Sequence, residues 1–303
     1  MTKKLKPVQI FLALGLATTM VACGNPSNDG GQTKEEVNQQ PSPTQTQGGE
    51  GGEGGEGGED QGGHGGHKDD QGGEGGEGGE GGEGASTGSP NVDYITSLGL
   101  MKGHLIAAGE LLEKGKYEQA VPHIGHPVEE LYGGIEPQLQ ERKVPEFKST
   151  LNQLNDLIKS APKDPKVKQL YQEASQKIDQ AMAAIPEKER QSSEFGLQVI
   201  NQMLRTAAEE YQAAIADGKI VEIVEYQDSM GFVAYAQTLY KDISQDIQQK
   251  SPEEAKKIAA KLDELEKTWP SVEPPNKPVK TTEEVYGLVG QIELASSSMT
   301  GQK

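Results

Sequence analysis

Residues 95–112, ITSLGLMKGHLIAAGELL, decide the fold class of this chain. Their apolar side chains recur at steps of three and four, which places them along one face of a helix. The positions that form this face are Ile95, Leu98, Met101, Leu105, Ala108 and Leu112. No later segment alternates apolar and polar residues as a half-buried strand would, so we predict an all-α fold.

Glycine and proline divide the rest of the helical region into further segments. Proline ends helices because it lacks a backbone N–H, and glycine ends them because its backbone is conformationally free. The predicted helices after the first cover about residues 117–141, 146–160, 165–185, 193–217, 219–248, 252–268 and 282–297.

Two similar turns indicate that the helical region is duplicated. LEKGKYE at residues 112–118 resembles IADGKIV at residues 215–221, and the offset between them is 103 residues. With this offset the repeat halves cover about residues 92–186 and 192–297, with about four helices in each. We therefore predict that residues 91–303 form a duplicated helical bundle with pseudo-two-fold symmetry.

The start of the chain has the features of an export signal. Lys3, Lys4 and Lys6 precede an apolar run that is too short to span a bilayer. MVACG at residues 20–24 resembles a bacterial lipobox, in which the signal is removed before a cysteine that carries lipid. We therefore expect residues 1–22 to be a signal peptide and Cys23, the one cysteine of the chain, to be the lipidation site.

Residues 23–90 have the composition of a disordered linker. They are rich in Gly-Gly-Glu repeats, and low hydrophobicity with one sign of charge leaves nothing to offset chain entropy. The helical domain would then hang from a lipid anchor on the periplasmic face of the cell envelope. Gly24 follows the cysteine, instead of the aspartate that retains some lipoproteins in the inner membrane, which favours the outer membrane.

The net charge of −18 and the missing basic patch exclude nucleic acid as the expected partner. The expected partners are instead the membrane, through the lipid anchor, and a metal transporter or another envelope protein.

The segment PHIGHPVEE at residues 122–130 interrupts a helix that the second half keeps whole. Pro127 removes a backbone N–H, crowds the carbonyl of His123 and pushes His126 out of helical geometry. Local conflicts of this kind are expected at functional or strained sites. If Pro127 begins a new helix, His126 lies at its boundary, Glu129 lies three residues on, and His123 comes from the preceding turn.

These side chains have the chemistry of metal ligands. Imidazole and carboxylate together suit zinc, iron or copper, so the expected cofactor is a divalent transition metal. His104 lies as far before the turn at Gly115 as His126 lies after it, so an antiparallel helix pair would bring both to the same height. Two acidic residues of the second half could close the site. The predicted metal ligands are His126, Glu129, His123, His104, Glu225 and Asp228.

A structural interpretation of the same residues stays open. A histidine beside a proline often caps a helix, Glu129 could reach back to the boundary N–H, and His104 could be an ordinary boundary residue. Catalysis has little support. The helical region has no cysteine nucleophile and no Gly-x-Ser-x-Gly turn, and residues 126–130 lack the His-Glu-x-x-His pattern of zinc hydrolases. We therefore predict no catalytic residues.

His126-Pro127-Val128-Glu129, in a duplicated and exported helical bundle, resembles the His-x-x-Glu motif of imelysin-like proteins. These are bacterial envelope proteins linked to iron uptake, and some are described as peptidases. The resemblance implies two similar helical bundles, with His126 and Glu129 as metal ligands. The chain departs from the family pattern, because Gly125 stands one residue before the histidine instead of two and a proline lies inside the motif.

Three functions follow from these observations. The first is a membrane-anchored envelope lipoprotein that binds a divalent transition metal for metal handling or uptake. The second is a non-catalytic interaction or structural module presented on a long tether. The third is an imelysin-type peptidase, which rests on the resemblance. The metal content of the purified protein separates the first function from the second.

Overall fold

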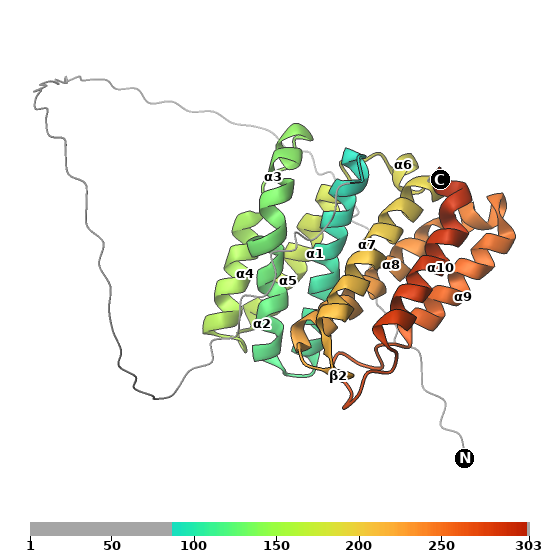
Figure 1. The fold of residues 1–303 in the computed structure, drawn as a ribbon. Helices are drawn as coiled ribbons and strands as arrows, with labels where there is room; N and C mark the ends of the chain where they lie inside the picture. Colours follow the sequence, from blue (N-terminus) through green and yellow to red (C-terminus); the bar gives the residue numbers. More distant parts are fainter. Residues whose placement is uncertain (1–86, 302–303) are drawn as a thin grey trace, which may run out of the picture. The chain divides into compact units, whose positions relative to one another are not determined.

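A computed structural model of the chain describes residues 87–301, which are almost entirely helical (Figure 1). The predicted signal peptide, Cys23 and the linker up to residue 86 lie outside the described residues. The fold class predicted from the apolar spacing, all-α, is confirmed. The helices are α1 (Pro90–Glu113), α2 (Tyr117–His126), η1 (Pro127–Leu131), α3 (Tyr132–Glu141), α4 (Lys148–Ser160), α5 (Pro165–Met182), α6 (Glu187–Arg190), α7 (Ser193–Ala213), α8 (Ile223–Lys250), α9 (Pro252–Glu266) and α10 (Thr282–Thr300).

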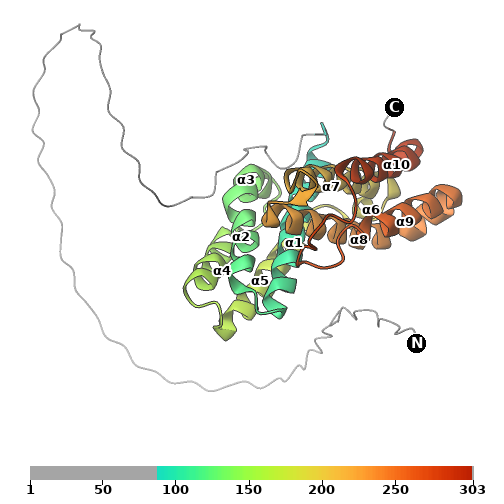
Figure 2. The ribbon, with the colours of Figure 1, turned by 60° about the horizontal axis from the view of Figure 1, so that its bottom comes forward.

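The helices form two bundles with the same order of packing. In the first, α1 packs against α2, α2 against α4, α4 against α5, and α5 against α1. In the second, α7 packs against α8, α8 against α9, α9 against α10, and α10 against α7. Figures 1 and 2 show α2 to α5 on one side, α7 to α10 on the other, and α1 at the boundary. The repeated sequence pattern thus corresponds to a repeated order of helices.

The two matched turns share a backbone conformation that glycine adopts readily. Gly115 has φ +72° and Gly218 has φ +68°, which is the left-handed region. The second turn is elaborated into a short antiparallel hairpin between β1 (Ile215–Ala216) and β2 (Lys219–Ile220). The prediction of one helix up to residue 217 was therefore too long, because α7 ends at Ala213 before this hairpin.

The two bundles meet where α1 packs on α7 and α8. At the crossing of α1 and α8 the backbones touch, since a Cβ on Gly231 would lie 2.2 Å from the carbonyl oxygen of Gly103. Only glycine permits two helices to approach this closely. His104 follows Gly103 directly and Asp228 lies one turn before Gly231, so the close crossing brings these two side chains together.

The prolines of the first bundle act differently from what the sequence suggested. His126 keeps helical dihedrals, with φ −50° and ψ −44°, and Pro127 continues the helix instead of beginning a new one. The chain widens into the π-helix η1, in which the Tyr132 N–H donates to the Pro127 carbonyl, five residues back. The prediction that Pro127 expels His126 from helical geometry was wrong, because the wider turn accommodates the proline. The equivalent helix α8 is continuous, as predicted.

The ends of several helices are fixed by side-chain caps. The side chains of Asp164 and Ser192 accept hydrogen bonds from backbone N–H groups at the starts of α5 and α7, and Thr281 and Glu284 form a capping box at α10. Among the described helices none is long and apolar enough to cross a membrane.

Candidate metal centre

Three buried side chains from three helices meet at the junction of the two bundles. His104 lies on α1, His123 on α2 and Asp228 on α8, and their ligand atoms all lie within 4.8 Å of one another. Asp228 Oδ1 lies 2.5 Å from His104 Nδ1 and 2.7 Å from His123 Nδ1. All three residues are among the predicted metal ligands, and the structure brings them together.

His126, at the end of α2, adds a third imidazole at the edge of this cluster. Its Nδ1 lies 3.2 Å from Asp228 Oδ2, and its ring meets the His104 ring edge-on with centroids 5.0 Å apart. The Nδ1 atom is buried but not aligned for a hydrogen bond with the carboxylate. The His126 side chain is 19% exposed, whereas those of His104 and His123 are fully buried, so His126 marks the solvent side of the cluster.

The Asp228 carboxylate is the centre of charge. Burial alone would raise the pKa of Asp228, but the charges and hydrogen bonds of His104 and His123 lower it well below its usual value. Burial acts to lower the pKa of His126, whereas close contact with Asp228 and its charge raise that pKa overall. Asp228 is therefore ionised at neutral pH, and it attracts cations to the cluster.

Gln227, which is not among the residues predicted from the sequence, fixes the orientation of His123. Gln227 is fully buried, and its Nε2 donates to the backbone carbonyl of Val272 at 3.0 Å. That bond sets the amide so that Gln227 Oε1 faces His123 Nε2 at 2.8 Å. Because an amide oxygen only accepts, His123 Nε2 carries the hydrogen of this bond. A neutral His123 therefore presents its Nδ1 lone pair to the cluster.

His123 Nδ1 and Asp228 Oδ1 then face each other as two acceptors. A second proton on His123 would satisfy this pair as an ion pair, and so would a cation bound by both atoms. The charges of His104 and His123 lower the pKa of Asp228, and this effect belongs to the first of these two arrangements, the ion pair. Metal-binding histidines typically donate their other ring N–H to a fixed acceptor, which is the arrangement that Gln227 provides.

The structure does not bring Glu129 into the cluster. Glu129 Oε1 accepts hydrogen bonds from Asn155 Nδ2 at 2.9 Å and Lys159 Nζ at 3.3 Å, both on α4. In a regular α-helix, residues three apart share a face, so the spacing of His126 and Glu129 suggested a common site. The π-helix between them changes this relation, and Glu129 turns toward α4 while His126 turns toward Asp228.

Glu225 lies beside the cluster and outside its innermost group. It precedes Asp228 by almost one turn of α8 and is half-buried. Burial and the nearby charges of Asp228 and Glu222 raise the pKa of Glu225, whereas His126 acts in the opposite direction. The Glu225 carboxyl group therefore interacts electrostatically with both Asp228 and His126.

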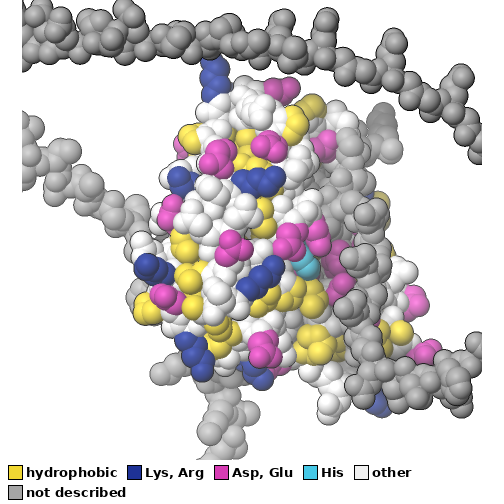
Figure 3. Space-filling view, turned by 90° about the vertical axis from the view of Figure 1, so that its left-hand side faces the viewer, with side chains coloured by type: hydrophobic (Ala, Val, Ile, Leu, Met, Phe, Trp, Pro, Cys, Tyr) yellow, Lys and Arg dark blue, Asp and Glu magenta, His cyan; other side chains and the backbone are white. Residues whose placement is uncertain are grey.

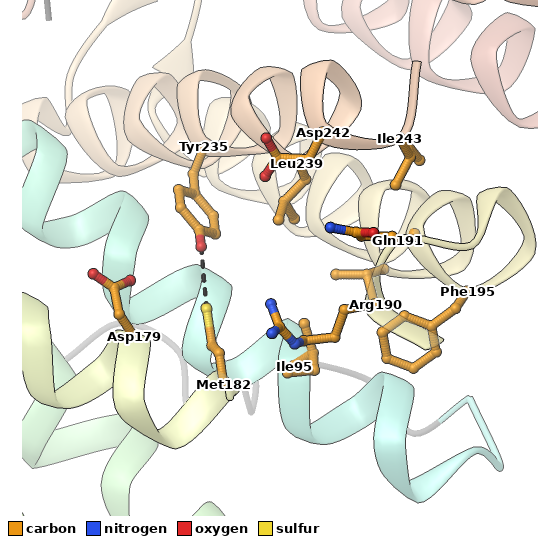
Figure 4. A pocket seen from close by; sticks show the side chains of 12 residues that line it. Ile95, Asp179, Met182, Arg190, Gln191, Phe195, Tyr235, Leu239, Asp242 and Ile243 are labelled. Atoms are coloured by element: carbon orange, nitrogen blue, oxygen red, sulfur yellow. Dashed lines mark hydrogen bonds between the residues drawn. The ribbon is translucent and has the colours of Figure 1, made fainter. Parts of the chain in front are cut away.

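A separate cavity of about 390 Å³ lies elsewhere between the bundles. Figure 4 shows its lining side chains, among which the Tyr235 hydroxyl donates to Met182 Sδ at 3.2 Å. Arg190, Asp179 and Asp242 also line it. None of the predicted metal ligands does, so this cavity is distinct from the histidine cluster.

Comparison with known protein families concerns the second bundle. Residues 186–303 match the family model of the iron permease-associated 4-helix bundle domain. This range begins just before α6 and includes α7 to α10. No curated protein and no solved structure matches the chain.

The matching family corrects the resemblance to imelysin-like proteins, which was wrong. The family found is an iron permease-associated bundle, and its match covers residues 186–303, which do not include the His-x-x-Glu segment. In the structure His126 contacts Asp228, whereas Glu129 contacts Asn155, so the two side chains of the motif have different neighbours. The peptidase function that rested on this resemblance loses its support.

The cluster lies across the boundary of the matched range. Asp228 and Gln227 belong to the matched bundle, whereas His104, His123 and His126 come from the first bundle. A cation held here would therefore take its negative charge from one bundle and its imidazoles from the other.

Proposed function

We propose that this protein binds a divalent transition metal, with iron as the first choice, and handles it in association with a metal permease. The observation that carries the proposal is the buried cluster of His104, His123 and Asp228, whose ligand atoms all lie within 4.8 Å of one another. A divalent cation bound by these three groups would take the place of the protons that otherwise link the imidazoles to the carboxylate.

The donor set supports a divalent ion. His104, His123 and Asp228 supply two imidazole nitrogens and one carboxylate, a set that non-haem Fe(II) sites use with further positions open. His126 lies where it could occupy one of those positions. The description of the matching family, iron permease-associated, supports iron over zinc and copper.

Asp228, the histidines and Gln227 have different roles in metal binding. Asp228 supplies the charge, and the neutral imidazoles complete the coordination. Gln227 holds His123 with its Nδ1 lone pair toward the ion. Since protons compete for the same lone pairs, metal affinity falls as the pH drops below about 6.5.

The lipid anchor at Cys23 is part of the same proposal. A basic start, a short apolar run and a lipobox-like segment support it, and the linker would let the helical domain reach a permease in a neighbouring membrane. The location proposed is the periplasmic face of the envelope, with the outer membrane favoured by Gly24.

Anaerobic equilibrium dialysis against Fe(II) tests the metal site. The full chain is used with His64→Asn and His67→Asn in every protein, so that linker histidines contribute nothing. We expect about one Fe(II) per chain at about pH 7.5 and several-fold weaker binding at about pH 5. Asp228→Asn should abolish binding, whereas Asp242→Asn, an exposed position on the same helix, should leave it intact.

Wild-type protein that retains no iron, zinc or copper at micromolar concentration would contradict the proposal. The three histidines and Asp228 would then be a structural ion-pair network, and the protein would be an interaction module.

A further inference from the structure

Neighbouring groups cover two sides of the cluster. The Phe232 ring covers His104 with centroids 4.8 Å apart. Gln227 and the Val272 carbonyl close the Nε2 side of His123. His126 is the ring that reaches solvent, and it does so on the face formed by the first bundle. A path between solvent and Asp228 therefore passes His126.

Carboxylates line this opening from both bundles. Glu130, on η1, is half-exposed and places its Oε1 3.7 Å from His126 Nε2. Glu225, on α8, is half-buried and lies three residues before Asp228, on the same side of the helix. Figure 3 shows a histidine side chain at the surface of this face with acidic side chains next to it. His126 thus connects an outer carboxylate, Glu130, with the inner carboxylate of Asp228, which its Nδ1 approaches to 3.2 Å.

We propose that His126, Glu130 and Glu225 form the portal through which a hydrated divalent cation, free of any organic chelator, enters and leaves the cluster. This inference rests on the proposed function and deepens it. Acidic groups at an opening raise the local concentration of cations and so raise the association rate. His126 then takes the ion as its first ligand and passes it to His104, His123 and Asp228.

The burial of the cluster defines the form of the substrate. His104 and His123 are fully buried and Asp228 is 2% exposed, so the ion must shed its surroundings before it reaches them. An organic chelate that stays on the metal does not fit past a single imidazole. The substrate is therefore the free ion, and a chelated metal must dissociate before it is bound.

Stopped-flow absorbance with Co(II) tests the portal on the full chain in the His64→Asn, His67→Asn background. The test variant is Glu130→Gln with Glu225→Gln, and Glu130→Gln alone is a milder version of it. The control is Glu253→Gln with Glu264→Gln, which removes the same charge from exposed positions of α9. Circular dichroism checks that each protein is folded.

Rim charges change association rates and their salt dependence, whereas ligands change dissociation rates. We expect the test variant to bind Co(II) about fivefold more slowly than the control at low salt, with the difference shrinking at high salt. The dissociation rate should change by less than about twofold, and the Co(II) spectrum should stay the same. With citrate added, the loading rate should follow free Co(II) instead of total Co(II).

Three results would overturn the portal. Equal association rates in the test variant and the control would show that these carboxylates do not guide the ion. A changed Co(II) spectrum or a faster dissociation would show that they are ligands. A loading rate that follows total cobalt in citrate would show that a chelate enters. If wild-type protein takes up no Co(II) at all, the proposed function fails first and the portal fails with it.

Discussion

Gln227 determines, through one hydrogen bond, which ring nitrogen of His123 faces the cluster without a hydrogen when that ring is neutral. Its amide is oriented by the Val272 carbonyl, and its Oε1 in turn accepts the His123 Nε2–H. Without this acceptor His123 could carry its proton on Nδ1, which would block the metal-binding lone pair. Partners of this kind typically contribute a factor of about 10 to 100 in metal affinity.

We therefore predict that Gln227→Met weakens Fe(II) or Zn(II) binding by about 10- to 100-fold in calorimetric titration. The matched control is Gln237→Met, also on α8, whose Nε2 donates to the Leu262 carbonyl at 3.3 Å. A shift of the Co(II) spectrum in the Gln227 variant alone would separate loss of orientation from loss of stability. Equal affinities in the two variants would contradict the role of Gln227.

At the scale of elements, the crossing of α1 and α8 determines whether the cluster can form. A Cβ on Gly231 would lie 2.2 Å from the Gly103 carbonyl oxygen, and neither backbone can move without separating the helices. Gly134 of α3 is also helical, but a Cβ there meets nothing within 4 Å. The two glycines thus differ in packing and share the same helical conformation.

Gly231→Ala should therefore destabilise the protein by about 1–3 kcal/mol and weaken metal binding, because Asp228 moves away from His104. Gly134→Ala should raise stability by about 0.5–1 kcal/mol, since alanine loses less chain entropy in a helix. Thermal unfolding followed by circular dichroism measures both. Similar melting temperatures in the two variants would show that the close crossing is less tight than described.

The start of α7 is tied to α8 by one carboxylate. Asp246 Oδ2 accepts from the Ser193 backbone N–H at 2.8 Å and from Lys250 Nζ at 2.7 Å. The hydrogen bonds from Lys250 and then Ser193 lower the pKa of Asp246 to about 2. The folded pKa lies below the unfolded value of about 3.9, so the stabilisation is complete above about pH 4 and is lost as the pH falls toward 2.

Asp246→Ala should accordingly lower the melting temperature by a few degrees at neutral pH, as the loss of an N-terminal helix cap does. The difference from wild type should shrink as the pH is lowered from about 4 toward 2. Asp242→Ala, about one turn earlier on α8, carries the same change of charge and serves as control. A difference that stays constant with pH would show that the carboxylate charge does not matter.

At the scale of the whole molecule, the sequence predicted most of the helices and the order in which they repeat. Apolar spacing and the turns at Gly115 and Gly218 predicted both, because these signals are local. The interrupted helix led to His123 and His126, and the repeat led to Asp228 on the equivalent helix. These residues could be predicted because proline and glycine cost stability wherever they interrupt a helix.

The positions of Glu129 and Gln227 depend on three-dimensional geometry that residue spacing along the sequence does not determine. Glu129 was assigned by α-helical periodicity, and the π-helix η1 turned it toward Asn155 instead. Gln227 was missed because a glutamine on a buried helix face has no motif. Its one signal is its position next to Asp228, which becomes meaningful only when His123 is known to lie opposite.

The anchor also belongs to this scale, and its prediction comes from sequence alone. Cys23→Ala should release the protein from the membrane fraction or leave its signal uncleaved, because stable anchoring requires acyl chains on that thiol. Membrane fractionation followed by mass spectrometry of the N-terminus measures this. An unmodified mature N-terminus in the wild-type protein would contradict the predicted lipid anchor.

The most direct test of the metal centre is anomalous X-ray diffraction at the iron edge from crystals soaked anaerobically in Fe(II). We predict one dominant anomalous peak at about 2.2 Å from His104 Nδ1, His123 Nδ1 and the Asp228 carboxylate, with His126 turned toward it. A cluster without an anomalous peak, or a dominant peak at another place in the protein, would contradict the claim that these residues hold the metal.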